Sequence, residues 1–251
     1  MISLARIDTV ADGVFRLAKA GVNCYVVADS DGLVLIDGGL PRTWPRLMSV
    51  LASLGATPSD LSAVVLTHGH FDHVGMCDRL RWEHRVNTHV HPEDQPLARH
   101  PYRYAHESPR WSYPVRHPAA IPTLARMAAA GALWVKGVKA KKDVVPGVRL
   151  DLPGGLTPIF APGHTNGHCA YLMEDRGILF SGDALVTYDP YTAERGPRIV
   201  AGAATANSGD ALTALDALES TRARLVLPGH GEVFRDGIGA AARQARAAGR
   251  S

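Results

Sequence analysis

The chain has 251 residues, of which 46% are hydrophobic and 20% are charged, and its formal net charge at pH 7 is only +3. This length can bury a substantial core, and the weak net charge provides no strong electrostatic field for nucleic acid or a membrane surface. The three scattered cysteines, Cys24, Cys77 and Cys169, form no disulfide framework and suit a reducing compartment. The one basic cluster, at 136–142, is typical of a solvated loop or helix end.

The N-terminal stretch carries charges at Arg6, Asp8 and Asp12 before any apolar run of signal-peptide length. No run anywhere approaches the roughly 18 apolar residues of a membrane span. We therefore expect a cytoplasmic protein, with leaderless secretion as an open alternative.

The first third of the chain alternates short apolar runs with turn residues. Such runs, bounded by Gly, Asp and Asn, predict strands. Leu47, Val50, Leu51 and Leu54 recur at helical spacing, with Pro45 in the first turn, and predict a helix. The expected order is strands at 13–19, 23–29 and 32–39, a helix at 42–54, a strand at 63–67, a helix beginning at Asp72, and a short strand and turn at 87–94.

Residues 95–143 break this pattern and are interpreted as an insertion that forms a lid. Its first part, 100–118, is rich in Pro, His, Tyr and Trp, and its second part, 119–137, is helical in pattern. Trp111 and Tyr113 are therefore candidate substrate-pocket residues. The alternative is a peripheral helical hairpin whose aromatic side chains only pack on the main body.

Strand-like runs return after the insertion, and a second amphipathic helix follows them. Asn207 or Ser208 can cap this helix, and Leu212, Leu215 and Leu218 lie on one side of it. The expected elements are strands at 147–153, 156–162, 168–174 and 177–186, a helix at 207–222, a strand at 224–231 and a closing Ala/Arg helix. No repeat or linker divides the chain, so we expect one domain over 1–251.

The sequence THGHFDHVG at 67–75 concentrates His68, His70, Asp72 and His73 directly after an apolar run. A polar, solvated turn is the simpler interpretation of one His-x-His pair. Four potential ligands in six positions indicate a metal site instead, because neutral imidazole and carboxylate are ligands of zinc and related divalent ions.

Three later residues can complete this ligand set. His164, Asp183 and His230 each follow a predicted strand and a glycine, which lets the backbone turn tightly. His68, His70 and His164 could then hold one metal ion and Asp72, His73 and His230 a second, with Asp183 bridging both. His168 could also ligate, but seven ligands already fill the site, so we expect it to support a ligand.

With these motifs, the chain resembles the metallo-β-lactamase superfamily. The family's His-x-His-x-Asp-His motif matches His68, His70, Asp72 and His73, its later ligands match His164, Asp183 and His230, and the resemblance spans roughly 13–235. It implies an α/β fold, a four-layer αβ/βα sandwich, here with a helical, aromatic-rich insertion. It also implies two divalent metal ions, usually Zn²⁺, with Fe or Mn as alternatives.

Two such ions, about 3.5–4 Å apart, can share a bridging water, lower its pKa and polarise a carbonyl. Asp72 is the candidate catalytic residue that orients the hydroxide and moves its proton. The resulting hypothesis is a hydrolase that opens an ester, thioester or lactone bond of a small molecule, without nucleic-acid or membrane partners. A homodimer is an open expectation.

Comparison with members of the family leaves alternatives. Glyoxalase II shares the seven ligands but carries an additional C-terminal helical domain. Quorum-quenching lactonases share the His-Phe-Asp-His version of the motif but place a tyrosine three residues after the bridging aspartate. Val186 stands there in this chain, and the nearest tyrosine, Tyr188, becomes a pocket candidate.

Other functional classes also remain. A persulfide dioxygenase with a single iron would need only part of the ligand set, and true β-lactamases are exported and lack an aspartate at the position of Asp183. A non-catalytic metal-binding protein is a third class.

Overall fold

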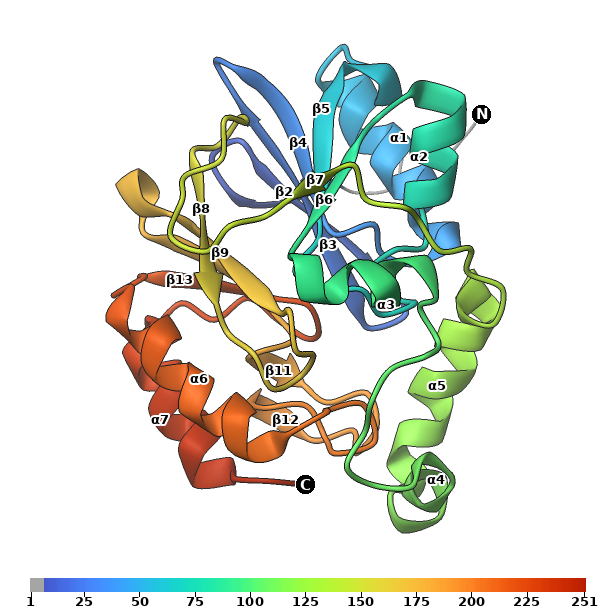
Figure 1. The fold of residues 1–251 in the computed structure, drawn as a ribbon, viewed down its shortest axis with the longest axis vertical. Coiled ribbons are helices and arrows are strands. Elements are labelled where there is room, and N and C mark those ends of the chain that lie inside the picture. The colour runs from blue at the N-terminus through green and yellow to red at the C-terminus, as the bar shows by residue number, and fades with distance from the viewer. Residues whose placement is uncertain (1–6) are drawn as a thin grey trace.

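Two β-sheets pack face to face, and helices cover the outer face of each sheet (Figure 1). The computed structural model describes residues 7–251. Arg6, one of the charges on which the expectation of a leaderless N-terminus depends, lies outside the described residues. The layers confirm the predicted four-layer αβ/βα sandwich.

The first sheet contains seven strands in chain order, antiparallel from β1 to β4 and parallel from β4 to β7. Side chains alternate between its two faces: Leu35 and Val64 pack toward the helices, while Val34 and Val65 pack toward the second sheet. The strands are β1 (Asp8–Ala11), β2 (Val14–Lys19), β3 (Val22–Asp29), β4 (Gly32–Ile36), β5 (Leu61–Val65), β6 (Thr88–Val90) and β7 (Lys142–Asp143), and the covering helices are α1 (Trp44–Ser53) and α2 (Cys77–His84).

The second sheet has the order β13-β10-β9-β8, with β10 and β13 parallel. Its outer face packs against two helices through Leu215 and Ala242, and its inner face contributes Tyr171 and Phe180 to the core between the sheets. Its strands are β8 (Leu156–Phe160), β9 (Cys169–Met173), β10 (Ile178–Gly182) and β13 (Leu225–Pro228), its helices are α6 (Ser208–Ser220) and α7 (Ile238–Ala248), and β11 (Val186–Tyr188) pairs with β12 (Arg195–Arg198) in a separate hairpin.

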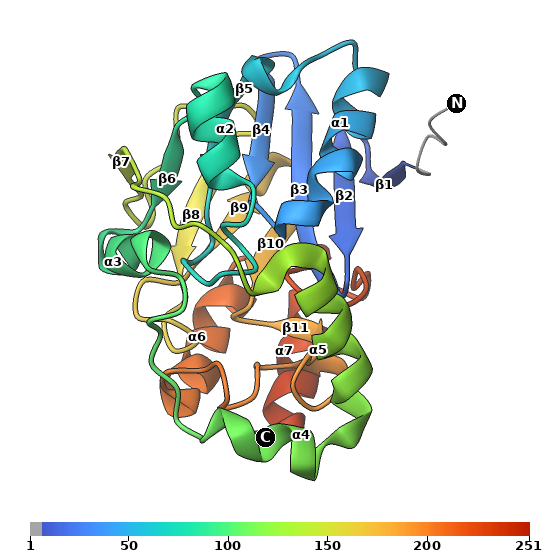
Figure 2. The same ribbon diagram turned by 90° about the vertical axis from the view of Figure 1, so that its right-hand side faces the viewer.

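Residues 95–141 lie outside these layers and contain α3 (Gln95–Arg99), α4 (Tyr113–Arg116) and α5 (Ile121–Met127), whereas the end of the predicted insertion forms β7 of the first sheet. In Figure 2, α5 lies below the ends of β2 and β3. There Met127 packs with Val22 and Leu40, and Leu124 and Phe71 border the same cluster. The insertion therefore contacts the histidine-rich loop that follows β5.

Several predicted elements differ from the structure. The helix expected from Asp72 begins five residues later, at Cys77, because the intervening residues form the histidine-rich loop. The helix expected over 119–137 is regular only over Ile121–Met127. A five-residue π-helical turn, Ala128–Ala132, follows it, and the φ of +98° at Gly131 within this turn breaks the helical geometry.

Two strands predicted after the insertion also differ from the structure. Residues 147–153 form a loop rather than a strand, because Pro146 precedes the segment, Pro153 ends it, and the Leu150 amide donates back to the Leu156 carbonyl. The run 177–186 divides at Gly182, whose φ of +51° ends β10 and sends the chain toward β11. Strands β1, β7 and β12 were not predicted.

Within residues 7–251, no helix is both long enough and apolar enough to cross a membrane. Cys24, Cys77 and Cys169 are all buried as free thiols.

The start of α6 joins the second layer of helices to a loop that carries a candidate ligand. Asn207 caps the helix by accepting from the Asp210 amide at 3.0 Å, and its own amide donates to the Gly163 carbonyl. The Ala206 amide donates to the carbonyl of His164. The cap therefore supports the loop at 163–164.

Asn207→Ala should lower the free energy of unfolding by about 1 kcal/mol, because the Asp210 amide loses its acceptor. Urea unfolding followed by circular dichroism measures this change. Thr213→Ala is the matched control, because Thr213 is an exposed residue in the middle of the same helix. Equal stability of both variants would contradict a capping role.

Candidate metal centre

The candidate ligands lie on loops that leave four strands at one edge of the sandwich. The loop after β5 carries His68, His70, Asp72 and His73, and the loop after β8 carries His164. Asp183 follows β10 and His230 follows β13 directly after single glycines. Because these strand ends meet at one edge, residues far apart in sequence become neighbours.

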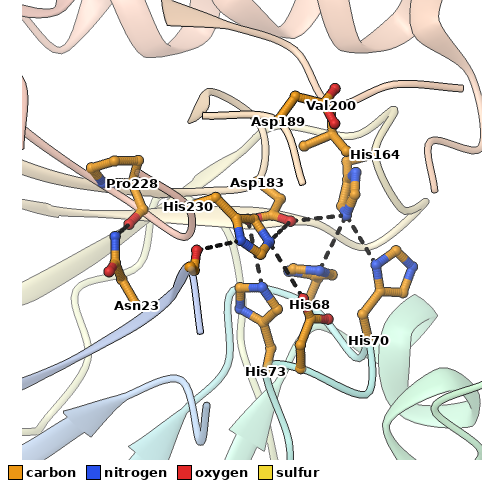
Figure 3. A network of polar contacts seen from close by, with 12 residues as sticks. Asn23, His68, His70, His73, His164, Asp183, Asp189, Val200, Pro228 and His230 are labelled. Carbon is orange, nitrogen blue, oxygen red and sulfur yellow. Dashed lines mark hydrogen bonds and ion pairs between the residues drawn. The ribbon is translucent and has the colours of Figure 1, made fainter. Parts of the chain in front are cut away.

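The structure brings all seven predicted ligands together. Figure 3 labels six of them, all except Asp72. His164 Nε2 lies 3.2 Å from His68 Nε2 and 3.0 Å from His70 Nδ1. Asp72, His73 and His230 form a second group, and within each group the potential ligand atoms lie within 4.8 Å of one another.

Asp183 connects the two groups. Its Oδ2 atom lies 3.4 Å from His164 Nε2 in the first group and 3.2 Å from His230 Nε2 in the second. Its Oδ1 atom lies 3.5 Å from His73 Nε2. The carboxylate is buried, and these distances place it between the two groups, where a bridging ligand would lie.

The side chains at this centre fit divalent cations. Burial lowers the pKa values of His68, His70 and His164 well below the usual histidine value, so these rings are neutral, as metal ligation requires. His73 Nε2 and Asp183 Oδ1 are buried and have no hydrogen-bond partner among the described residues. Imidazole nitrogen and carboxylate oxygen atoms that converge and lack hydrogen-bond partners are typical of a site for zinc or a similar ion.

The second group attracts positive charge. Burial alone would lower the pKa of His230, but the carboxylates of Asp183 and Asp72 raise it to about 10. Burial is likewise outweighed at His73, where Asp183 and Asp37 hold the pKa well above its usual value. Bound protons or a divalent cation can supply the positive charge that these carboxylates favour.

Asp37 fixes the orientation of His73. Its Oδ2 atom lies 2.9 Å from His73 Nδ1 and accepts from the Thr67 hydroxyl, while Oδ1 accepts from the Thr67 amide at 2.7 Å. A carboxylate bonded to one ring nitrogen directs the other nitrogen toward a metal ion. Asp37 was not predicted, although it follows the apolar strand β4 in the same way that the ligands follow their strands.

Asp94 connects two of the ligand loops. It accepts from the Gly69 amide between His68 and His70, and from the Gly167 amide and the Thr165 hydroxyl beside His164, at 2.8–2.9 Å. This role could not be predicted from the sequence, because the partners lie 25 to 73 residues away from Asp94.

His168 supports Asp183, in agreement with the expected supporting role. Its Nε2 atom accepts from the amides of Asp183 and Ala184 at 3.0 and 3.2 Å. Burial, with a smaller contribution from His164, lowers its pKa to about 3. The neutral ring therefore remains an acceptor that holds the loop after β10.

Gly229 leaves room for the second group. A Cβ atom there would lie 2.1 Å from Asp183 Oδ1 and 2.9 Å from His73 Cε1. Only glycine allows the backbone before His230 to approach these side chains so closely.

The three predicted pocket residues lie away from this cluster. Trp111 is 78% exposed, and the buried Tyr113 donates its hydroxyl to the Ser251 carbonyl at 2.9 Å. Tyr188 lies beside Thr123 of α5, with 2.6 Å between their hydroxyl oxygens. The structure brings none of them into contact with the candidate ligands, and a substrate role for them stays a prediction.

Two tyrosines that were not predicted as site residues lie closer. The Tyr104 ring centroid is 4.2 Å from that of His70, and the Tyr104 and Tyr191 hydroxyl oxygens are 3.3 Å apart. Tyr104 was visible in sequence only as one of several aromatic residues in the insertion.

Comparison with known sequences decides the family. The sequence model of the metallo-beta-lactamase superfamily matches residues 18–230. The chain belongs to the metallo-β-lactamase superfamily. The matched range contains all seven candidate ligands, and members of this superfamily are generally metal-dependent hydrolases.

Individual members of the superfamily are distant in sequence. The probable metallo-hydrolase YflN of Bacillus subtilis is 26% identical over 189 residues, which are 71% of this chain and 66% of YflN. An N-acyl homoserine lactonase of a Bacillus species is 26% identical over 205 residues, 71% of this chain and 68% of the lactonase. The structure of TTHA1623 in a di-iron-bound form is 25% identical, has a TM-score of 0.65, and covers 96% of this chain and 98% of its own.

Asp37→Asn should weaken metal binding by about 10- to 100-fold, because a supporting carboxylate that fixes the His73 ring is lost. Competition with a chromophoric chelator measures the affinity. The exposed Asp151, changed to Asn, is the matched control. Unchanged affinity in Asp37→Asn would show that Thr67 and the loop backbone alone position His73.

Proposed function

We propose that the chain is a hydrolase that uses two divalent metal ions to cleave an ester, thioester or lactone bond of a small molecule. The observation that carries this proposal is Asp183, whose carboxylate contacts a histidine of each three-residue group. Zinc is the first choice of metal, and iron or manganese are alternatives that suit the same nitrogen and oxygen donors.

His68, His70 and His164 would hold one ion, Asp72, His73 and His230 the other, and Asp183 both. When bound, such a pair of ions supplies an activated water and polarises the carbonyl of the substrate. Asp37 and Asp94 keep the ligand side chains and loops in place through the hydrogen bonds described above.

Asp72 is the residue that we propose to orient the water and accept its proton. Its Oδ2 atom lies 3.4 Å from His230 Nε2, and the side chain is buried in the same cluster. Burial opposes ionisation, but His230 and His73 lower the pKa of Asp72 below its usual value. The group is therefore a carboxylate that can take up a proton at an oxygen atom next to the site.

A cavity of about 340 Å³ beside His164 supports a small-molecule substrate. Tyr104 and Leu97 contribute apolar surface to it, and Asn166 contributes an amide. Its volume lies at the lower end of the range for small-molecule sites. We propose that this cavity receives the part of the substrate next to the scissile bond.

The second group of ligands favours hydrolysis at two metals over oxygen chemistry at one iron. A single-iron site would leave part of the Asp72, His73 and His230 group without a role. The related TTHA1623 structure is described as di-iron-bound, so iron itself is compatible with a two-metal site in a relative. The lactonase among the relatives makes lactones the first substrates to test.

We also propose that the protein acts in the cytoplasm, because its three cysteines are buried free thiols. The insertion at 95–143 remains our candidate for the segment that shapes the pocket, since Tyr104 contacts His70 and α5 packs near Phe71.

Elemental mass spectrometry of the protein, purified without added metal, should find two metal ions per chain. Asp183→Ala should bind fewer ions and lose hydrolysis of lactones, thioesters and esters, because both groups lose their shared carboxylate. Asp175→Ala, on a side chain that is 82% exposed, is the control and should keep both properties.

Full metal content and full activity in Asp183→Ala would overturn the assignment. A single iron per chain in the unmodified protein would favour the oxygenase alternative, and oxygen consumption with a persulfide would then be the decisive assay.

A further inference from the structure

Two phenol groups from distant segments meet beside His70 of the candidate metal centre. Tyr104 belongs to the insertion, and Tyr191 to the hairpin between β11 and β12. Their hydroxyl oxygens are 3.3 Å apart, within hydrogen-bond distance. The Tyr104 ring is tilted by 45° against the His70 ring at a centroid distance of 4.2 Å. Tyr104 therefore lies against a residue of the cluster itself, and Tyr191 is its hydrogen-bond partner.

Contacts on several sides hold this pair in place. The Arg110 guanidinium carbon lies 3.9 Å from the Tyr104 ring centroid, and an Arg110 nitrogen donates to the Tyr104 carbonyl at 3.3 Å. Val186 and Val200 pack with Tyr104 in an apolar cluster that Tyr191 borders. The pair is thus positioned before any substrate binds.

Asp189 determines the position of Tyr191. One of its carboxylate oxygens accepts from the Tyr191 amide at 2.7 Å, and the other accepts from the Ala201 amide at 2.7 Å. This buried aspartate fixes the turn of the hairpin on which Tyr191 lies.

Each phenol carries one proton, and a hydrogen bond between the two oxygens uses only one of them. The other O–H group has no acceptor among the described residues. A phenol keeps its proton at neutral pH, so both groups are neutral and can donate a hydrogen bond.

Other tyrosines of the insertion use their hydroxyls differently. Tyr102 donates to the Ala132 carbonyl at 2.8 Å and accepts from the Val135 amide at 2.7 Å, and Tyr113 donates to the Ser251 carbonyl. Their hydroxyls hold backbone segments. Within residues 7–251, the hydroxyls of Tyr104 and Tyr191 have only each other as hydrogen-bond partners, which distinguishes them from purely structural phenols.

We propose that the Tyr104–Tyr191 pair binds the substrate oxygen on which negative charge develops during hydrolysis, with the free O–H group as the donor. This inference rests on the proposed function. No bond to the phenols forms or breaks: the proton stays on its phenol oxygen and the pair stabilises the charge by hydrogen bonding. Tyr104 also lines the cavity beside His164, so a substrate in that cavity would contact it.

Loss of a phenol hydroxyl from this pair should lower kcat. A prepositioned hydrogen-bond donor to a developing oxyanion contributes about 10²- to 10³-fold to kcat when it is the principal donor. Because metal ions would share the charge here, we expect Tyr104→Phe and Tyr191→Phe each to lower kcat by roughly 10- to 100-fold. KM and metal content should change little, since phenylalanine keeps the ring that packs on His70.

The first test measures binding rather than activity. Phenylphosphonate, whose tetrahedral oxyanion resembles the charge distribution of the hydrolytic intermediate, is titrated calorimetrically into the metal-loaded protein. Tyr104→Phe and Tyr191→Phe should each weaken its binding by about 10-fold, as expected for loss of a hydrogen bond to a charged oxygen. Tyr102→Phe is the matched control, because it removes a phenol hydroxyl of the same insertion that serves the backbone.

Equal phosphonate affinity in the wild type and both variants, or no binding to the wild type, would overturn the proposal. A rise in KM with unchanged kcat would also overturn it, because the pair would then serve only ground-state binding. If the wild type hydrolyses no lactone, thioester or ester, the proposed function fails, while the phosphonate titration still decides whether the pair binds an oxyanion.

Discussion

The buried charge of Asp183 is the constraint on which the rest of the site depends. A carboxylate removed from water is costly unless charge and hydrogen bonds compensate it. Histidines from three different loops face this carboxylate, and His168 holds its backbone from behind. Neither histidine group can be understood alone, because each shares the same anion. A site that gathers this much negative charge and neutral imidazole is suited to cations of high charge density.

The sandwich makes this arrangement possible through its strand ends and its glycines. Strands β5, β10 and β13 end at one edge, and Gly182 and Gly229 let their loops turn inward where a side chain would collide with Asp183, Thr67 or His73. Asn23 then ties the loop after β13 to the first sheet by donating to the carbonyls of Pro228 and Gly231. The loop that carries His230 is therefore held by both sheets.

The sequence was sufficient to find the candidate ligands, because each one follows a strand and most lie next to a glycine, a pattern visible within a few residues. The layers followed from the resemblance that these ligands carried. The supporting role of His168 was predicted, but those of Asp37 and Asp94 were not, for a physical reason. These two aspartates bind partners 25 to 73 residues away, and such pairing appears only after folding. The prediction of a strand at 147–153 was wrong because it used only the alternation of apolar residues. Pro146, Pro153 and the turn that brings the Leu150 amide to the Leu156 carbonyl prevent a strand there.

The metal ligands and the residues that surround a substrate come from different parts of the chain. Metal ligands can be read from the chain because the chemistry allows few residue types at fixed places, whereas the layer above them combines residues from the insertion and from the β11–β12 hairpin. Tyr104 and Tyr191 meet there although 87 residues separate them, and Val186 packs in the same cluster. Val186 stands three residues after Asp183, and the rings of Tyr104 and Tyr191 pack around this small side chain. Substrate choice in this chain is therefore expected to depend on how the insertion and the hairpin pack together, and less on the ligand set below them.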